Sequence, residues 1–353
     1  MSSHLPQEIH HESQTGRGPA VAKPSVLDQL RSGERPRVDP ALGGGLREWL
    51  EDSLAEHVAE LPASVSSVRV NKQSLSQVLL CEAHYLAQKG AIGVQSVEML
   101  LGTLVDALFR VHITAGSGAY AANPLEAALL VLEAEGDRDD VVGALKELGG
   151  DGTRRLSEQL RAHMEHVGAD WSPLPSSWLP RTQEKVEIPL AGGRVLLTGV
   201  FDLLLGAPAA ERASECILEL KSGRRRLDHR LDLQFYALIE TLRSGAPPFR
   251  VATYYSSTGE LDTEDIFEEM LLASLRRTLD GTIRLCRLVS GEEARRTPNP
   301  LCAWCAGLDE CGPGTERVAS GADSPEEADR GWAAEMAAEM VQVADVDMEE
   351  DQP

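Results

Sequence analysis

The sequence predicts an α/β fold in which a central sheet is flanked by helices. In the N-terminal half the apolar residues recur at helical spacing, as at Met99, Leu104 and Leu108. After about residue 185 the pattern becomes extended, with short apolar runs separated by turn residues. A length of 353 residues with 42% hydrophobic residues suffices for one large domain with insertions or for two small domains.

The expected helices of the first half are, in order, Leu46 to Leu61, Ser74 to Lys89, Ser96 to about Val111, and an insertion from Asn123 to about Val167. Ser96 is a favourable N-cap, and Pro124 suits the first turn of a helix. Gly136 and the pair Gly149-Gly150 interrupt the insertion. A proline-rich connection follows, in which Trp171 and Trp178 are expected in the core rather than stacked on nucleic-acid bases.

The expected strands are Lys185 to Leu190, Val195 to Leu205, Cys216 to Leu220, and Arg250 to Ser256. Ala191-Gly192-Gly193 has the composition of a hairpin turn between the first two strands. A helix from His229 to Leu242 is expected before the last strand.

Both termini differ from the middle of the chain. Residues 1–45 lack an apolar period and are expected to be disordered, with His4, His10 and His11 in a solvated tail rather than a metal site. Residues 317–353 form an acidic tail. Its apolar stripe through Trp332 and Met336 could dock a partner or cover a nucleic-acid groove, but a solubilising role is favoured.

The net charge of -22 argues against a simple nucleic-acid binder, because phosphate neutralisation requires clustered lysines and arginines. The charge is unevenly distributed, however. Eleven acidic residues and one arginine lie between Asp323 and Pro353, so about ten of the net negative charges lie in the tail. Basic residues cluster elsewhere and are expected to create a local positive field: Lys221, Arg224, Arg225, Arg226 and Arg230.

Compartment signals are consistent with a cytoplasmic protein. No apolar run approaches the ~18–20 residues of a membrane helix, and the N-terminus lacks the apolar core of a signal peptide. In the cytoplasm the six cysteines are expected to be metal ligands or buried thiols rather than disulfides. Cys216 and Cys286 lie in apolar stretches and are expected in the core.

Asp202 stands at the end of one apolar stretch, and Glu219-Leu220-Lys221 ends the next, so both carboxylates are expected at the ends of adjacent strands. Two carboxylates on adjacent strands can converge on one or two hard cations, which activate water and neutralise a phosphate. Lys221 is two residues past Glu219 and therefore on the same face of its strand, where it can orient or deprotonate the attacking water. This pattern is typical of phosphodiester cleavage.

The cysteines near the C-terminus form a C-x2-C-x5-C run of Cys302, Cys305 and Cys311, and Cys81 is the distant residue that could complete a four-thiolate site. Four thiolates can hold zinc or an iron–sulfur cluster, and spacing alone slightly favours zinc.

Together these motifs resemble the RecB-like branch of the PD-(D/E)XK nucleases that carry an iron–sulfur cluster, a group that includes the AddB nuclease domain, the CRISPR-associated spacer-acquisition nucleases and the exonuclease V family. The similarity runs from about Val70 to Cys311. The segment from Gln73 to Leu86 is similar to the family's first cysteine helix, with Val78 where an aromatic residue often stands. The final cysteine spacing also matches.

The resemblance implies a mixed sheet flanked by helices, in an iron–sulfur nuclease domain at residues 46–316 with a helical insertion and connection at 114–180. It implies Mg2+ or Mn2+ bound by Asp202, Glu219 and the Leu220 carbonyl. It also implies a structural 4Fe-4S cluster on the four cysteines, which would tie the N-terminal helix to the C-terminal segment.

The chain departs from the family at two motifs. Relatives carry Gly-x-x-x-His before the sheet, whereas this chain has Gly102 and Asp106, so Asp106 either replaces the histidine ligand or lies on the surface. The metal-ligand role is favoured, because an unpaired carboxylate would be costly in this apolar run. Relatives also carry Gln-x-x-x-Tyr after the catalytic strand. Here Tyr236 matches the tyrosine, Asp232 occupies the glutamine position, and Gln234 is displaced by two residues.

We therefore expect a metal-dependent DNA nuclease, an exonuclease or end-processing enzyme that acts on single-stranded DNA in repair or recombination. Residues expected to bind DNA are Arg224, Arg225, Arg226 and Gln234. The chain lacks a G-x4-G-K-[ST] loop, so any unwinding requires a helicase or recombination partner. The alternatives are a CRISPR spacer-acquisition nuclease and a non-catalytic, cluster-stabilised DNA-binding subunit.

Overall fold

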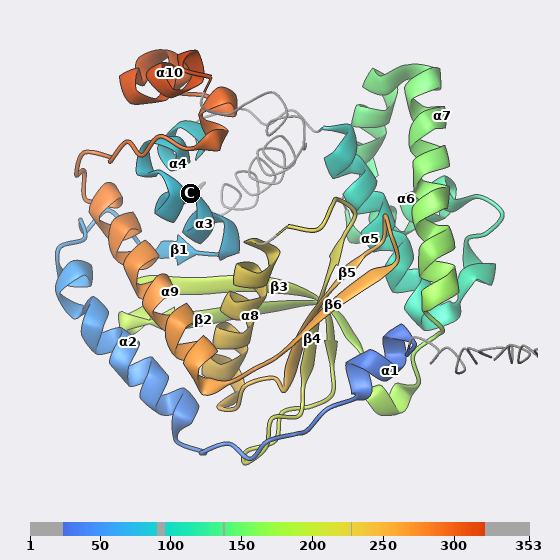
Figure 1. The fold of residues 1–353 in the computed structure, drawn as a ribbon, viewed down its shortest axis with the longest axis horizontal. Coiled ribbons are helices and arrows are strands. Elements are labelled where there is room, and N and C mark those ends of the chain that lie inside the picture. The colour runs from blue at the N-terminus through green and yellow to red at the C-terminus, as the bar shows by residue number, and fades with distance from the viewer. Residues whose placement is uncertain (1–23, 90–95, 137, 227, 322–353) are drawn as a thin grey trace, which may run out of the picture.

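A computed structural model describes residues 24–89, 96–136, 138–226 and 228–321. It contains a six-stranded mixed sheet with helices on both faces (Figure 1), which confirms the α/β prediction. The strands are β1 (Val68–Val70), β2 (Arg181–Leu190), β3 (Val195–Leu205), β4 (Cys216–Lys221), β5 (Arg250–Tyr255) and β6 (Glu260–Asp265). The histidines near the N-terminus and the apolar stripe through Trp332 and Met336 lie outside the described residues.

The α-helices are α1 (Val26–Arg31), α2 (Leu42–Ala59), α3 (Lys72–Leu80), α4 (Glu82–Lys89), α5 (Val97–Ala115), α6 (Pro124–Glu135), α7 (Arg138–Asp170), α8 (Asp228–Ser244), α9 (Glu268–Val289) and α10 (Gly312–Ala319). Ser96 caps α5 by accepting a hydrogen bond from the Met99 amide, as its sequence position predicts. Gly136 ends α6 in the left-handed conformation, and Gly149 interrupts α7, so both glycine breaks are confirmed. None of the described helices is long and apolar enough to span a membrane.

The sheet order is β1-β3-β4-β5-β6, with β2 paired to β3. β1 pairs with β3 and β4 pairs with β5 in parallel, whereas β2–β3, β3–β4 and β5–β6 are antiparallel. β4 and β5 are buried along nearly their whole length, which is expected for central strands covered on both faces.

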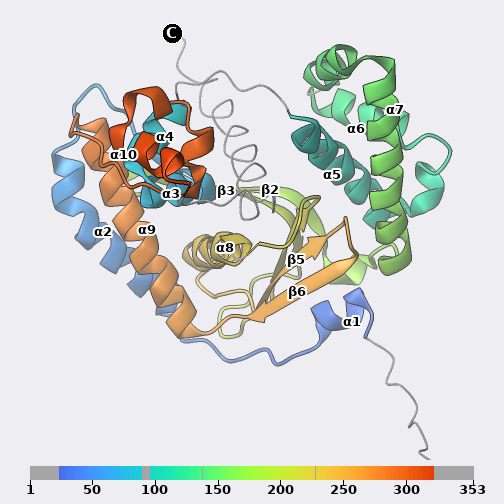
Figure 2. The same ribbon diagram turned by 45° about the horizontal axis from the view of Figure 1, so that its top comes forward.

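Alternating side chains of the central strands divide the core into two halves. Leu218 packs with α5, α6 and α7 on one face, and its neighbour Ile217 packs with α2, α8 and α9 on the other. Figure 2 shows these two groups of helices on opposite sides of the sheet. The helical insertion thus shares one half of the core with α5 and with side chains of β4 and β5.

Three expectations about the chain need correction. Residues 24–45 are not wholly disordered, because α1 buries Val26 and Leu30, and Arg250 donates hydrogen bonds to backbone and side-chain oxygens of this segment. The predicted helix from Ser74 to Lys89 is divided at Cys81, which is extended with φ -163° and ψ 114°. The short β1, the edge strand β6 and the helix α9 were not expected at all.

Trp171 lies in the core as expected. Its ring is buried in edge-on contact with Phe109 and Tyr254, at centroid distances of 5.0 and 5.4 Å. Both Cys216 and Cys286 are buried among apolar residues, which confirms their expected positions.

Candidate active site

β3 leaves part of one edge open beside the candidate site. β2 pairs with β3 from Val195 to Leu204 on one edge, so β1 and β4 must share the other. β1 pairs with residues 195–197 and β4 with residues 203–205. In the described ladder, residues 198–202 therefore face a gap between β1 and β4 on this edge.

Asp202 and Glu219 meet at this gap. Leu203 pairs with Leu218 in an antiparallel ladder, so one further step places Asp202 opposite Glu219. In place of a ladder bond, Asp202 Oδ2 accepts a hydrogen bond of 2.7 Å from the Leu220 amide. Asp202 thus lies inside β3 and not at its end, where the sequence pattern placed it, and its carboxylate is fixed to the backbone of β4.

Glu219 is surrounded by two lysines. Lys221 Nζ lies 3.2 Å from Glu219 Oε1, as the two-residue spacing predicted, and Lys72 Nζ forms a second ion pair with the same oxygen. The other oxygen, Glu219 Oε2, is buried and accepts no hydrogen bond within the described structure. An unmatched carboxylate oxygen in a buried site is an available ligand for a cation.

Burial acts to raise the pKa of both carboxylates, but the neighbouring lysines reverse the shift at Glu219. Burial, followed by the charges of Glu219 and Asp106, raises the pKa of Asp202 well above its ordinary range. Burial also acts to raise the pKa of Glu219, but Lys72 and Lys221 outweigh it, so the pKa of Glu219 is lowered. The site therefore concentrates negative charge that its own lysines only partly neutralise.

Asp106 extends the cluster from α5. Gln183 Nε2 donates a hydrogen bond of 3.1 Å to Asp106 Oδ1, and Arg110 Nε lies 3.0 Å from Oδ2. Burial raises the pKa of Asp106 to about 6 against the opposing charge of Arg110. The charges of Glu135 and Glu219 raise it further. Asp106 thus faces the carboxylate cluster and is not a simple surface residue.

Two local features bring Asp106 to the cluster. A β-carbon at Gly102 would lie 3.2 Å from Ser222 Oγ, so glycine lets α5 pack tightly on the turn after β4. Gln183 has a positive φ of 51°, and the β2–β3 register skips Gln183 and Asp202 between its paired residues. This strained position turns the Gln183 side chain toward Asp106. Gln183 could not be recognised from the sequence, because a strained residue within a strand leaves no periodic pattern.

Tyr236 packs beside the site from α8. Its ring contacts Phe201 in an edge-on arrangement at 5.0 Å, and Lys72 Nζ lies 4.9 Å from its centroid. A β-carbon at Gly199 would come within 2.9 Å of the Tyr236 ring, so the glycine before Asp202 permits α8 to cross β3 here. Gln234 is half-buried, and its backbone carbonyl accepts a hydrogen bond from Ser274 of α9.

Lys72 was missed by the sequence interpretation. It is the first residue of α3, whose N-cap Asn71 forms a capping box with Ser74. A lysine at a helix N-terminus is unfavourable with the helix dipole, and this mismatch was the available sequence signal. Its partner Glu219 is 147 residues away, so only the folded chain shows the reason for a basic residue there.

The basic cluster after β4 is less free than its sequence suggested. Arg225 Nε lies 2.5 Å from Asp262, and Arg226 pairs with Asp228 with only 8% of its side chain exposed. Arg224 is exposed. The geometry argues against the expected DNA contact by Arg226, because its guanidinium is already buried in an ion pair.

A second candidate site lies where α4 meets the C-terminal segment. Cys81, Cys302, Cys305 and Cys311 line one cavity of about 350 Å³. The amides of Thr297 and Asn299 lie 3.4 Å from Cys81 Sγ and 3.3 Å from Cys302 Sγ, in hydrogen-bond geometry. A β-carbon at Gly314 would be 3.2 Å from Cys311 Sγ and 3.6 Å from Cys302 Sγ, so glycine keeps this space open. The predicted approach of Cys81 to the C-terminal cysteines is observed.

Neither cluster is preassembled around a single ion. In the described part of the chain, no three histidine, cysteine or acidic side chains are close enough together to hold one metal ion. Lys72, Arg110 and the Leu220 amide each bind an oxygen of a different carboxylate. These contacts compete with a cation that the three carboxylates would share.

Comparison with known proteins gives one family match and weak similarities to solved structures. No curated protein matches the chain in sequence. Among solved structures, a candidate exonuclease from Eubacterium rectale is 14% identical with a TM-score of 0.46, over 70% of this chain and 89% of that chain. The protein SSO0001 is 13% identical with a TM-score of 0.29, over 76% and 97%. A family model for the PD-(D/E)XK nuclease superfamily matches residues 69–312, most of the chain, and the protein therefore belongs to that superfamily.

Proposed function

We propose that the protein is a divalent-metal-dependent DNA nuclease. The observation that carries this proposal is the convergence of Asp202, Glu219 and Lys221 at the gap in the sheet, with Glu219 Oε2 buried and unmatched. A structural ion-pair network would satisfy both oxygens of a buried carboxylate, whereas a metal site requires an oxygen that remains available.

The proposed ligands are Asp202, Glu219, the Leu220 carbonyl and Asp106 in place of the family histidine. These are all oxygen ligands, which suit hard Mg2+ and Mn2+. When bound, such an ion lowers the pKa of a coordinated water and neutralises the phosphate. The ligands would have to move closer together, because each is held by a lysine, an arginine or a backbone amide in this structure.

Lys221 has the role of orienting or deprotonating the attacking water. Its ammonium is 3.2 Å from Glu219, and 12% of its side chain is exposed, so it can reach both the carboxylates and a bound phosphate. Tyr236 belongs to α8, and we propose that its ring holds Lys72 and this helix against the site. Of the expected DNA contacts, Arg224 and Arg225 are exposed, and Arg225 also pairs with Asp262. Gln234 is half-buried and displaced by two residues from the family glutamine position.

Cleavage assays with end-labelled single-stranded and double-stranded DNA test this function under anaerobic conditions. We expect cleavage of single-stranded DNA from an end, with Mg2+ or Mn2+ and not with EDTA. Circular substrates distinguish an exonuclease from an endonuclease. Failure of the full chain to cleave any DNA with either metal would support the non-catalytic alternative.

We further propose that the four cysteines hold a 4Fe-4S cluster. Zinc requires all its thiolates on one ion, with sulfurs about 3.8 Å apart from Zn–S bonds of ~2.3 Å. A four-iron cluster distributes its thiolates over separate irons, which suits a roomy cavity with backbone amides aimed at the sulfurs. The cluster would fix α4 to the segment at Arg295, whose amide already donates a hydrogen bond to Glu82.

Metal analysis of anaerobically purified protein tests the cluster. We expect about four irons per chain and a brown colour, as four-thiolate ligation of a 4Fe-4S cluster implies. Cys302→Ala should abolish both, whereas the buried Cys286→Ala should retain them. Stoichiometric zinc without iron would contradict the cluster.

A further inference from the structure

Lys72 is a buried cation inside the proposed metal site. Its side chain is 19% exposed and forms an ion pair with Glu219 Oε1. The Tyr236 ring holds the same ammonium from α8, at 4.9 Å from the ring centroid. Asp202 and Asp232 add further negative charge nearby. Lys72 is thus held in place by residues of β4, β3 and α8, although it belongs to none of these elements.

The two lysines on Glu219 have different surroundings. Lys221 is the family lysine and follows Glu219 on the same strand. Lys72 enters from the opposite side of the gap, just after β1 ends at Val70. Its ammonium is paired with Glu219 Oε1, so a cation shared by Glu219 and Asp202 would have to compete with it for that oxygen.

We propose that Lys72 is a tethered counter-ion of the metal site, which neutralises Glu219 until a divalent cation displaces it. This inference rests on the proposed function of the site. Lys72 then sets the metal concentration at which the site fills, because every bound cation must first separate the ammonium from Glu219. Lys72 is accordingly a positioning residue and not a source of protons in cleavage.

A titration with Mn2+, followed by the electron paramagnetic resonance signal of free Mn2+, tests the proposal in the full-length protein without DNA. Lys72→Met keeps the length of the side chain and removes its charge. We expect it to bind Mn2+ at least about tenfold more tightly, since a unit charge within a few ångströms opposes a divalent ion. Lys72→Arg should bind as wild type does, because the positive charge is restored.

The matched control is Arg69→Met. Arg69 lies three residues earlier, on β1, and pairs with the exposed Glu187 away from the site. The Arg69→Met variant should bind Mn2+ with unchanged affinity. Should Lys72→Met not fold, as judged by thermal unfolding, Lys72→Gln provides the same test.

Weaker or unchanged Mn2+ binding by a folded Lys72→Met would overturn the proposal, since a purely structural lysine cannot tighten metal binding when it is removed. Asp202→Asn separates this failure from failure of the proposed function. If wild type binds Mn2+ and Asp202→Asn does not, the metal site is supported. The result with Lys72→Met then tests the role of Lys72 alone. Equal binding by both would contradict the metal site and the role of Lys72 together.

Discussion

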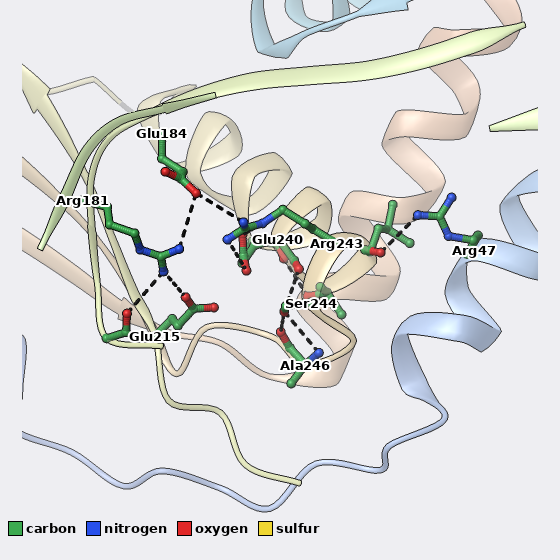
Figure 3. A network of polar contacts seen from close by, with 12 residues as sticks. Arg47, Arg181, Glu184, Glu215, Glu240, Arg243, Ser244 and Ala246 are labelled. Atoms are coloured by element: carbon green, nitrogen blue, oxygen red, sulfur yellow. Dashed lines mark hydrogen bonds and ion pairs between the residues drawn. The ribbon is translucent and has the colours of Figure 1, made fainter. Parts of the chain in front are cut away.

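Two buried acidic clusters lie at opposite ends of β4 and differ in how their charges are matched. At the end of β4, Glu219 has lysines on one oxygen and nothing on the other in the described structure. Just before its start, Glu215 and Glu240 lie in a network with arginines (Figure 3). Arg243 pairs with both oxygens of Glu240, at 2.8 and 3.0 Å.

This difference shows that burial of acidic residues does not by itself mark a functional site. The arginine fork binds both carboxylate oxygens at once, so neither oxygen of Glu240 is left without a partner. Lysine is a point charge that satisfies one oxygen and can be displaced. The arginine cluster instead joins β2 to β4 and α8, since Arg181 pairs with Glu184 and Glu215, and Arg243 also reaches Glu184. We interpret it as structural.

The largest effect is expected from Lys221→Ala at the lysine cluster. The rate of DNA cleavage should fall by about two to four orders of magnitude, as loss of a positioned acid–base group does. Stability should change little, because Glu219 keeps Lys72 as a partner. Single-turnover cleavage measures the rate, and the exposed Lys185→Ala on β2 is the control. Equal activity of Lys221→Ala and wild type would refute the assignment of the active site.

Glu215→Ala should have the opposite effects, a loss of stability without a loss of activity. Its carboxylate is buried and lies 2.5 Å from Arg181, so removal should lower the free energy of unfolding by about 2–3 kcal/mol. Activity per folded molecule should remain unchanged. Urea unfolding measures the loss, and the exposed Arg154→Ala should cost less than about 0.5 kcal/mol. A loss of cleavage without a loss of stability would show that the arginine cluster also serves function.

The pH dependence of stability distinguishes the clusters further. Burial raises the pKa of Glu240 from its ordinary value of 4.5 to about 7, although Arg243 opposes the shift. Between these values the folded protein binds more protons than the unfolded chain, so this contribution is complete below pH 4.5 and is lost as pH rises toward 7.

Glu240→Gln should therefore flatten this decline, by on the order of 1–3 kcal/mol between pH 5 and pH 8. The measurement compares the free energies of unfolding of wild type and variant across this range, because the difference isolates Glu240 from other titrating groups. Parallel curves would mean that Glu240 is ionised throughout in the folded protein.

The smallest effect is expected from Asp106→Ala. Both oxygens of Asp106 already have partners, Arg110 and Gln183. Asp106 is therefore expected to contribute least to metal binding among the proposed ligands. Half-maximal cleavage should require about tenfold more metal, as expected for losing one ligand or its support. Asp106→His should retain activity and raise the Mn2+ to Mg2+ rate ratio, because imidazole favours softer metals. Wild-type cleavage by Asp106→Ala at limiting metal would exclude Asp106 as a ligand.

Local sequence signals predicted most of the central fold. Ser96 and Gly136 mark real helix ends because capping depends on residues within one turn. The hairpin of β2 and β3 followed from its turn and alternating pattern. The edge strand β6 has a mixed burial pattern with no apolar period, and α1 is held by Arg250 from more than 200 residues away. Neither could be recognised from its own residues.

For the candidate site, the sequence by itself determined the chemistry that the chain carries: Asp202, Glu219, Lys221 and the spacing of the four cysteines. Those residues belong to recurring motifs whose spacing is local. Tertiary structure alone decided that Lys72 reaches Glu219 and that Gln183 holds Asp106. The physical reason is that electrostatic pairing depends on distance in space, and the fold brings together side chains that the chain separates by 147 and 77 residues, respectively.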